Sequence, residues 1–326
     1  MPLLITRDDV ARLFASNYER VVGAILDRVE AGYREVAAGT HQEHPRIYLR
    51  SKSDPERRPP GLFSMSALLG EAGLMGTRLL ALGGPTSEAG DGMLILFDQR
   101  AKRCLAIVWD PGLHDYRSGA PAGVAAKYLA RPNAETVGVI GSAGISAGTL
   151  AMIRHVRPSV ARVRVFSPTP ANRERFAERM RAELACDVRA VGSAEEAAHG
   201  ADIVITATDA DHPVVPDTAI GPGTYVAVMA RNEIESATFL RSRIILSSQT
   251  AWDALDPQPH EPMPPQAIAG ELADLVAGTI SVPYRPDGVT VFAGCAPLAM
   301  WDVAAAAAVF EVARDLGIGK EISLLN

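Results

Sequence analysis

Residues 136–153, TVGVIGSAGISAGTLAMI, give the strongest local signal of the fold class. This stretch begins with an apolar segment, 136–140, of the kind found in strands that are buried on both faces of a sheet. Gly141, Gly144 and Gly148 follow, the last at the start of a helical pattern. Dinucleotide-binding domains use glycine at such a turn because the chain bends tightly and its backbone must approach a pyrophosphate. The N-terminus of the following helix offers N–H groups and a positive dipole end to that anion.

Downstream of this turn, apolar strands and helical stretches alternate. The predicted strands are 163–166, 188–191, 201–208, 225–229 and 243–246. The predicted helices are 149–156, 172–184 and 193–199. Strands that alternate with helices form crossover units, which place the strands parallel in one sheet. We therefore predict an α/β fold with a Rossmann-type parallel sheet for this part of the chain.

The first third of the chain has a different pattern. Thr6 precedes two acidic residues and an apolar helical repeat that ends at Gly39, which predicts a capped helix. Between 46 and 109, short apolar segments separated by turns rich in proline and glycine predict a mainly antiparallel sheet. A helix over 118–130 leads toward the glycine turn, and a helix with one apolar face covers 297–316.

The composition excludes several classes of protein. The chain has 326 residues, of which 32 are basic and 38 acidic, and its net charge of −6 argues against a nucleic-acid binder. Its three cysteines are far apart, as expected for a reduced, cytoplasmic protein. No apolar run is long enough to span a bilayer, and the N-terminus lacks a signal-peptide pattern. His41 and His44 have no evident third ligand, so we predict no metal site.

The glycine turn supplies the first candidate cofactor-binding residues. They are Gly141, Ser142, Ala143, Gly144, Ile145 and Ser146. The end of the second strand ordinarily selects the cofactor, because an acid there binds the ribose 2′-hydroxyl of NAD. This chain has Ser167, Thr169 and Arg173 there and no acid, and hydroxyls with an arginine suit a 2′-phosphate. We predict NAD(P)(H) as the cofactor, with NADP(H) favoured over NAD(H).

Two other interpretations of the glycine turn stay open. It can be a plain structural joint between a strand and a helix. Residues 144–148 also match G-x-S-x-G, the nucleophile elbow of α/β-hydrolases, with Ser146 as the nucleophile. The triad partners would be Asp209 or Asp211 and His260. Against this hydrolase interpretation, the strand ends five residues before Ser146, which therefore falls inside the start of the helix.

Basic side chains indicate an anionic substrate. Arg46, Arg50 and Lys52 alternate along one predicted strand and therefore point to the same face. Arg78 lies on a later strand, and Arg117 opens the helix before the glycine turn. Arginine binds carboxylates through two parallel hydrogen bonds. Solvated surface charge is the alternative explanation, above all for Arg50 and Lys52.

The order of several segments resembles the ornithine cyclodeaminase/mu-crystallin family over most of the chain. The matching segments are RIYLR (46–50), MGTRLL (75–80), LHDYRSGAPAGVAAKYLARP (113–132), VGVIGSAGISA (137–147), EEAAHGADIVITAT (195–208) and VTVFAGCAPLAMWDVAAA (289–306). The third of these resembles the family pattern that begins T-x-x-R-T-A-A. Each motif alone is weak, but their order and spacing together are specific.

This resemblance implies an NAD(P)-dependent enzyme that acts on an amino or imino acid and forms a homodimer. It implies a substrate-binding and dimerisation domain, of α+β type, that is built from 1–120 and 297–326. The dinucleotide-binding domain, 121–296, is then inserted before the last helix.

The resemblance also implies roles for single residues. Arg46 and Arg117 match arginines that hold the substrate carboxylate. The segment from Gly141 to Ser146 matches the pyrophosphate loop, and Thr208 matches a residue near the nicotinamide ribose. We add Met229 to the cofactor-binding candidates.

Three positions depart from the family pattern. Arg78 stands where the family has a lysine that assists proton transfer, and arginine stays protonated. Phe63 replaces a glutamate near the substrate amine, and Glu235 replaces an aspartate that assists ornithine cyclisation. These changes argue against ornithine cyclodeamination.

We therefore interpret the chain as an enzyme that transfers hydride to or from an α-imino or α-amino carboxylate, as in a ketimine reductase or an amino-acid dehydrogenase. The predicted catalytic residues are Arg78, Arg117 and Glu235, with His114 as the alternative proton-handling group. The predicted substrate-binding residues are Arg46, Met65, Arg78 and Arg117. Three alternatives stay open: an ornithine cyclodeaminase-type lyase, a non-catalytic nucleotide- or ligand-binding homologue, and a serine hydrolase that uses Ser146.

Overall fold

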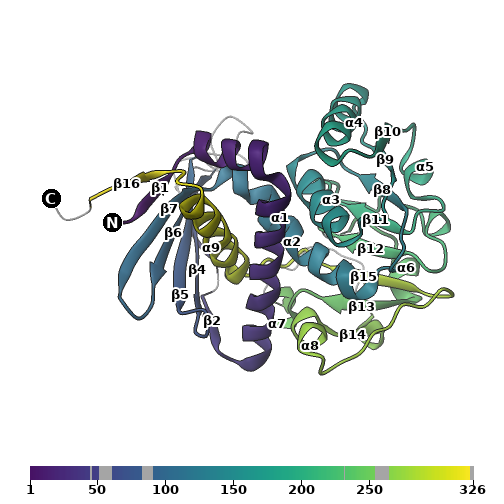
Figure 1. The fold of residues 1–326 in the computed structure, drawn as a ribbon. Coiled ribbons are helices and arrows are strands. Elements are labelled where there is room, and N and C mark those ends of the chain that lie inside the picture. The colour runs from purple at the N-terminus through teal and green to yellow at the C-terminus, as the bar shows by residue number, and fades with distance from the viewer. Residues whose placement is uncertain (45, 51–60, 83–90, 231, 254–263, 324–326) are drawn as a thin grey trace. The chain divides into compact units, whose positions relative to one another are not determined.

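The structure, a computed structural model, describes residues 1–44, 46–50, 61–82, 91–230, 232–253 and 264–323 (Figure 1). The chain forms two compact units. The first comprises Met1–Arg117 and Leu298–Asn326, and the second comprises Ser118–Pro297. The predicted α/β fold with a parallel sheet is confirmed. Among the described helices, each is too short or too polar to cross a membrane.

The first unit begins with the long helix α1 (Arg7–Ala38). Its N-terminus is capped by Thr6, whose side chain accepts a hydrogen bond from the Asp9 N–H at 3.3 Å. The Asp9 carboxylate in turn accepts one from the Thr6 N–H at 3.0 Å. The helix ends at Gly39, whose φ of 68° lies in the left-handed region that glycine adopts most readily. The capped helix predicted from these residues is confirmed.

The first unit also contains an eight-stranded sheet in which most neighbours are antiparallel. Its strands are β1 (Leu3–Ile5), β2 (His41–Glu43), β3 (Ile47–Arg50), β4 (Gly61–Leu69), β5 (Leu74–Leu82), β6 (Gly92–Asp98), β7 (Arg103–Trp109) and β16 (Lys320–Glu321). Their spatial order is β16-β1-β7-β6-β5-β4-β2, and β3 pairs with β4. Only the pair of β1 and β7 is parallel among the described strands of this sheet. The register of β4 and β5 places Met65 directly opposite Arg78.

Two helices contain charged residues of the site described below: Arg117 on the helix that follows β7 and Asp302 on the C-terminal helix. The C-terminal helix α9 (Ala299–Asp315) packs on α1 and on strands β4 to β7. Helix α2 (Pro111–Leu129) begins seven residues before the predicted start at 118, because Pro111 suits the first position of a helix. The boundary between the two units falls inside α2, after Arg117.

The second unit contains an eight-stranded parallel sheet. Its strands are β8 (Thr136–Ile140), β9 (Arg162–Phe166), β10 (Asp187–Ala190), β11 (Ile203–Thr206), β12 (Tyr225–Val228), β13 (Ser242–Leu246), β14 (Ile268–Glu271) and β15 (Val289–Ala293). Their order is β10-β9-β8-β11-β12-β15-β13-β14. The chain places β9 and β10 on one side of β8 and then crosses over to place β11 and β12 on its other side. The strand order therefore reverses direction at β8. Ligands of such sheets bind at the carboxyl ends of the strands at this switch point.

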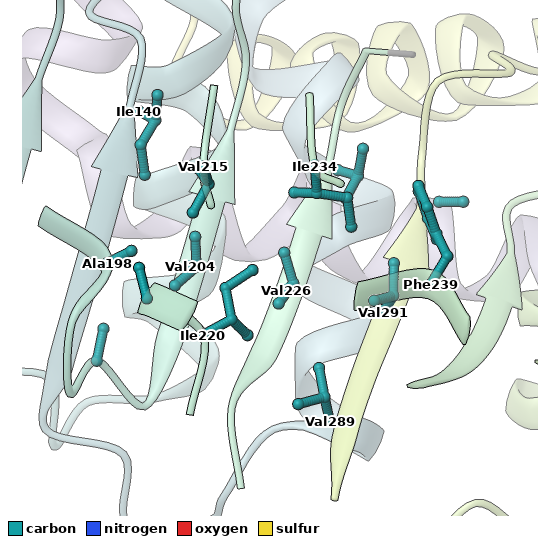
Figure 2. Close-up of a cluster of buried hydrophobic side chains, with 14 of the residues drawn as sticks. Ile140, Ala198, Val204, Val215, Ile220, Val226, Ile234, Phe239, Val289 and Val291 are labelled. Atoms are coloured by element: carbon teal, nitrogen blue, oxygen red, sulfur yellow. The ribbon is translucent and has the colours of Figure 1, made fainter. Parts of the chain in front are cut away.

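Helices connect the strands of the second unit. They are α3 (Gly144–Val156), α4 (Pro170–Leu184), α5 (Ala194–Ala198), α6 (Ser236–Leu240), α7 (Gln249–Asp253) and α8 (Leu272–Ala277), with short 3₁₀ turns η1 (Asp217–Ala219) and η2 (Pro265–Ala267). Figure 2 shows the hydrophobic core on one face of the sheet. Ile140, Val204, Val226 and Val291, from four neighbouring strands, lie there with Phe239 of α6. This core fixes the strands whose carboxyl ends carry the loops described below.

Helix α3 begins five residues before the predicted start at 149, so half of the glycine stretch is helical. A Cβ atom on Gly119 would lie 2.4 Å from the Thr149 nitrogen and 2.6 Å from the Gly148 carbonyl carbon. The backbones of α2 and α3 are therefore in contact at this point. Such tertiary packing stabilises a helical turn whose glycine content disfavours helix formation.

Candidate active site

A cluster of buried charged side chains lies in the first unit. Arg78 is on β5, Asp110 directly precedes α2, Arg117 is on α2, and Asp302 is in the first turn of α9. Their exposed fractions are 4%, 1%, 3% and 0%. Burying a charge is costly unless an opposite charge and hydrogen bonds compensate for the lost hydration. Here each arginine lies beside an aspartate.

Arg78 is held by Asp110. Its Nε and Nη2 atoms both donate to Asp110 Oδ2, at 3.0 and 2.6 Å. The Phe63 ring lies on another side of the guanidinium group, with its centroid 5.6 Å from Cζ. Burial opposes the charge of Arg78, but the hydrogen bond and charge of Asp110, with the charge of Asp302, raise its pKa above the ordinary value. Arg78 is therefore a permanent cation that binds anions and does not transfer protons.

Asp302 lies close to both arginines. Its Oδ1 atom is 2.9 Å from Arg117 Nε and 3.8 Å from Arg78 Nε. The angles at the shorter contact are not those of a hydrogen bond, and neither oxygen of Asp302 accepts one from the described residues. Burial raises the pKa of Asp302, and the positive charges of Arg117 and Arg78 oppose this shift. Burial also lowers the pKa of Arg117, against the charge of Asp302.

His114 lies between the two arginines. Its Nδ1 atom is 3.1 Å from Arg78 Nη2 and 2.9 Å from Arg117 Nη2. Guanidinium groups only donate, so Nδ1 accepts both hydrogen bonds and the ring proton is on Nε2. Burial, followed by the charges of Arg117 and Arg78, lowers the pKa of His114 to about 2. The ring therefore stays neutral near pH 7 and is too weak a base for the proton-handling role that we gave it as the alternative.

The other predicted substrate-binding residues lie in the same unit. Arg46 is half-buried before β3, and its charge opposes the raised pKa of Asp302. Met65 is 4% exposed and pairs with Arg78 across the sheet. The structure thus brings Arg46, Arg78 and Arg117 close to one buried carboxylate. Lys52, also predicted on this strand, lies outside the described residues. The backbone of Arg50 is described, but its side chain is not.

In the second unit, the glycine turn lies against the loop that follows β11. Gly141 has a φ of +105°, and a Cβ atom there would lie 2.1 Å from the Ala207 carbonyl oxygen. Only glycine fits both the conformation and the space. Ala143 is the N-cap of α3 and provides no side-chain hydrogen bond. The first turn of α3 also contains no acidic residue, so this helix terminus is suited to an anion.

The position of Ser146 argues against the hydrolase interpretation. Its side chain is fully buried within α3, and its hydroxyl donates to the Ala207 carbonyl at 3.4 Å. One proposed triad acid, Asp211, is exposed and forms an ion pair with His212. His260 lies outside the described residues. A serine hydroxyl buried in this way cannot serve as an exposed nucleophile.

The residues at the end of β9 form a small network. Ser142 donates to the Ser167 hydroxyl at 2.8 Å, which ties the glycine turn to this strand end. Arg173 donates to the carbonyls of Ser167 and Pro168, at 2.8 and 3.4 Å. Thr169 is the N-cap of α4 and gives no side-chain hydrogen bond to it. The hydroxyls and the guanidinium group predicted for this position are therefore close together.

Sequence reasoning missed Glu233, which is fully buried at the carboxyl edge of the sheet. Its Oε1 atom accepts hydrogen bonds from the N–H and the hydroxyl of Thr208, at 2.5 and 2.8 Å. Its Oε2 atom accepts one from the Ala230 N–H at 2.8 Å. Burial raises the pKa of Glu233 to about 7, although these hydrogen bonds oppose the shift. Glu233 thus fixes Thr208 and the loop after β12, beside Met229, whose N–H donates to the Thr206 carbonyl at 2.9 Å.

Glu235, the acid that sequence reasoning selected, has a different environment. It is half-buried at the N-cap of α6, and its Oε2 atom accepts a hydrogen bond from the Asp217 N–H at 2.9 Å. The two glutamates are separated by one residue in Asn-Glu-Ile-Glu, and nothing in the neighbouring sequence distinguishes one from the other. The local sequence therefore contains no signal for Glu233, whose burial is visible only in the structure.

Comparison with known proteins gives consistent relatives. The chain is 26% identical to the Δ1-pyrroline-2-carboxylate reductase of Paracoccus denitrificans over 222 residues, 65% of this chain and 69% of that protein. A solved structure of the Thermococcus litoralis Δ1-pyrroline-2-carboxylate reductase with NADH and L-proline has a TM-score of 0.82 at 24% identity and covers 98% of this chain and 100% of its own. An archaeal alanine dehydrogenase dimer with bound NAD has a TM-score of 0.80 at 21% identity and covers 99% of both chains.

These two structures support the fold, and a sequence model decides the family. The model that matches is that of the ornithine cyclodeaminase/mu-crystallin family, and the match covers residues 8–317. That range includes the arginine cluster, the glycine turn and Glu233. The chain therefore belongs to the ornithine cyclodeaminase/mu-crystallin family.

Proposed function

We propose that this chain is an NAD(P)-dependent oxidoreductase that transfers hydride to or from an α-imino or α-amino carboxylate. The observation that carries the proposal is the buried pair of Arg78 and Arg117, held in place by Asp110 and Asp302. Two fixed guanidinium groups suit a carboxylate. The family, and relatives named as Δ1-pyrroline-2-carboxylate reductases, support an imino acid as the substrate.

The residues of the second unit fit a dinucleotide. The backbone of Gly141 to Ser146, with the uncapped start of α3, would bind the pyrophosphate. Ser167, Thr169 and Arg173 would bind the adenosine ribose, and the lack of an acid among them favours a 2′-phosphate. Thr208 and Met229 would lie near the nicotinamide ribose. The bound nicotinamide would supply or accept the hydride.

The arginines and one acid would perform the remaining chemistry. Arg46, Arg78 and Arg117 would hold the substrate carboxylate and so orient the α-carbon. Positioning of this kind lowers a reaction barrier by several kcal/mol, of the order of 7–11 kcal/mol in the best cases. In the reductive direction the α-carbon gains a hydride and the imine nitrogen gains a proton, which gives the amine. We assign the proton to Glu235 and the positioning of Thr208 to Glu233.

One observation argues against the cyclodeaminase alternative. The position that holds a glutamate in cyclodeaminases is Phe63, which is 5% exposed and packs on Arg78. An aromatic ring cannot accept hydrogen bonds from a substrate amine as a carboxylate does. We therefore place hydride transfer ahead of cyclodeamination.

We further propose a homodimer formed through the first unit. Leu49 on β3 and Leu62 on β4 are paired across the sheet and are 63% and 45% exposed. Ile47, two residues before Leu49 and therefore on the same face of β3, is 48% exposed. An exposed apolar strand face of this kind marks a protein contact, and the alanine dehydrogenase neighbour is a dimer. The three cysteines, odd in number and far apart in the sequence, fit a reducing compartment, and we propose the cytoplasm.

Two measurements test this function. Fluorescence titration with NADH and NADPH should show binding of at least one, and the ratio of the two dissociation constants tests the proposed 2′-phosphate preference. A panel of cyclic imines, and of α-keto acids with amines, should then show oxidation of the bound cofactor with at least one compound. Failure to bind either nucleotide would overturn the proposal. Binding without turnover on any compound of the panel would instead favour a non-catalytic binding protein.

A further inference from the structure

We propose that His114 is a positioning residue that sets the spacing of Arg78 and Arg117 by accepting a hydrogen bond from each through the single atom Nδ1. This inference rests on the proposed function, because it concerns how the two arginines receive a carboxylate. The family pattern that matches this segment has threonine three residues before the arginine, where this chain has His114. At this position the chain therefore differs from that pattern.

The geometry brings two like charges together. Nη2 of Arg78 is 3.1 Å from His114 Nδ1, and Nη2 of Arg117 is 2.9 Å from the same atom. The two Nη2 atoms are therefore at most about 6 Å apart. Two cations at that distance repel each other, and more strongly inside a protein than in water. A shared acceptor between them offsets this repulsion and fixes the angle at which each guanidinium group is presented.

One turn of α2 supplies the parts of this arrangement. His114 and Arg117 are three residues apart and lie on one face of the helix. Asp110 precedes the helix, and its carbonyl accepts a hydrogen bond from the His114 N–H at 2.9 Å. The same residue's carboxylate binds Arg78. A rotation of this turn would therefore move both arginines together.

The ring must be neutral for this role. A protonated ring would donate from Nδ1 and add a third positive charge between the arginines. Burial and the two arginine charges hold the pKa of His114 at about 2, so the ring does not titrate between pH 5 and pH 9. A positioning role therefore predicts an effect on carboxylate binding that does not depend on pH in this range.

Two substitutions separate this role from simple core packing. His114→Asn keeps an acceptor, because the asparagine carbonyl oxygen reaches about the place of Nδ1. His114→Leu keeps a similar volume and removes the acceptor. The probes are L-proline and L-prolinamide, which lacks the carboxylate, and both are measured by calorimetry on the full chain saturated with NADH.

We expect His114→Leu to weaken L-proline binding roughly tenfold to a hundredfold, as expected for a lost hydrogen bond to a charged group. His114→Asn should bind L-proline within about threefold of the wild type, and the affinity for prolinamide should not change by more than about twofold in either variant. Wild-type affinity in His114→Leu, or an equal loss for prolinamide, would overturn the proposal. Equal weakening in both variants would also overturn it.

A spectroscopic measurement keeps the inference testable if the variants fail to fold or the wild type does not bind L-proline. In ¹⁵N-histidine NMR spectra of the wild type, the His114 ring should carry its proton on Nε2 from pH 5 to pH 9. A ring protonated on Nδ1 would overturn the positioning role. Absence of L-proline binding together with the Nε2 tautomer would count against the proposed substrate class and leave the arginine geometry supported.

Discussion

Replacement of Glu233 by glutamine should change the pH dependence of stability. The carboxyl group is fully buried and accepts hydrogen bonds from Thr208 and from the Ala230 N–H. Burial raises its pKa to about 7 from an ordinary value of 4.5. In the substitution Glu233→Gln this group no longer titrates, while most of its shape and one acceptor oxygen remain.

The sign follows from where the proton is bound. Between pH 4.5 and about 7 the folded chain keeps the proton on Glu233 and the unfolded chain has released it. The free energy of unfolding of the wild type must therefore fall as the pH rises through this range. At 1.36 kcal/mol for each pH unit, the full effect is about 3 kcal/mol. About 2.5 kcal/mol of it lies between pH 5 and pH 8, because the unfolded carboxyl group is already partly ionised at pH 5.

The assay is thermal unfolding of both proteins at pH 5, 6, 7 and 8. For a domain of this size, 1 kcal/mol shifts Tm by about 2–4 °C. The wild-type Tm, relative to that of Glu233→Gln, should thus be roughly 5–10 °C lower at pH 8 than at pH 5. A constant offset from the hydrogen bond that glutamine loses at Ala230 does not affect this slope.

Asp202→Asn provides a matched control in the same unit. Burial alone would raise the pKa of Asp202, but hydrogen bonds from Glu135 and Thr136 and the charge of Arg131 outweigh it and lower the pKa below 3.8. Its stabilising contribution is lost only as the pH falls through that lowered value, so the Tm difference from the wild type should be constant from pH 5 to pH 8. Parallel Tm profiles for the wild type and Glu233→Gln would show that Glu233 does not titrate with a raised pKa. The same would follow if the Tm difference between the wild type and Asp202→Asn changed with pH as much as the difference between the wild type and Glu233→Gln.

Three further substitutions test other parts of the structure. Gly141→Ala would place a Cβ atom 2.1 Å from the Ala207 carbonyl oxygen. We therefore expect at least tenfold weaker NADH binding by fluorescence titration and a loss of about 1–3 kcal/mol in the free energy of unfolding. Binding and stability equal to those of the wild type would contradict the packing of this turn. Asp110→Asn leaves Arg78 buried without its main counter-charge and should lower the free energy of unfolding, measured by denaturant titration, by about 3 kcal/mol. Arg78→Lys should cost about 1–2 kcal/mol in the same measurement, because an ammonium group cannot bind Asp110 and His114 in the same geometry; catalysis that appears only in this variant would mark the native chain as a binding protein.

Elements with local signals could be predicted from the sequence. Helix α1 is defined by a cap at Thr6 and a stop at Gly39, which are both readable within a few residues. The strand before Gly141 and the turn after it are equally local. The order of strands is not local: β15, the last strand of the second unit in the chain, lies between β12 and β13. No periodicity within residues 289–293 indicates that place.

The chemistry of the candidate site divides in the same way. Arg78 and Arg117 could be selected from the sequence because a basic residue on a predicted strand or at a helix start is visible locally. Their shared counter-charge, Asp302, could not be identified, since it lies far along the chain from both arginines. The environment of Glu233 is set by the loops after β11 and β12, which meet only in the folded sheet. Burial and partners are properties of the fold, and both decide a pKa.

The arginine at position 78 and the histidine at position 114 depend on each other structurally. A guanidinium group has donors on three nitrogens, so Arg78 can bind Asp110 through Nε and Nη2 while Nη2 also reaches His114. The lysine that the family places at position 78 has one nitrogen and cannot make this set of contacts. A threonine at position 114 is too short to present one acceptor to two guanidinium groups. Because a permanent cation at position 78 must be compensated inside the protein, the neutral ring and the Asp110 carboxylate are the parts of this chain that make the exchange of lysine for arginine tolerable. Arg78 and His114, which both differ from the family pattern, are thus parts of one structural arrangement, in which a permanent cation shares its contacts between a carboxylate and a neutral ring.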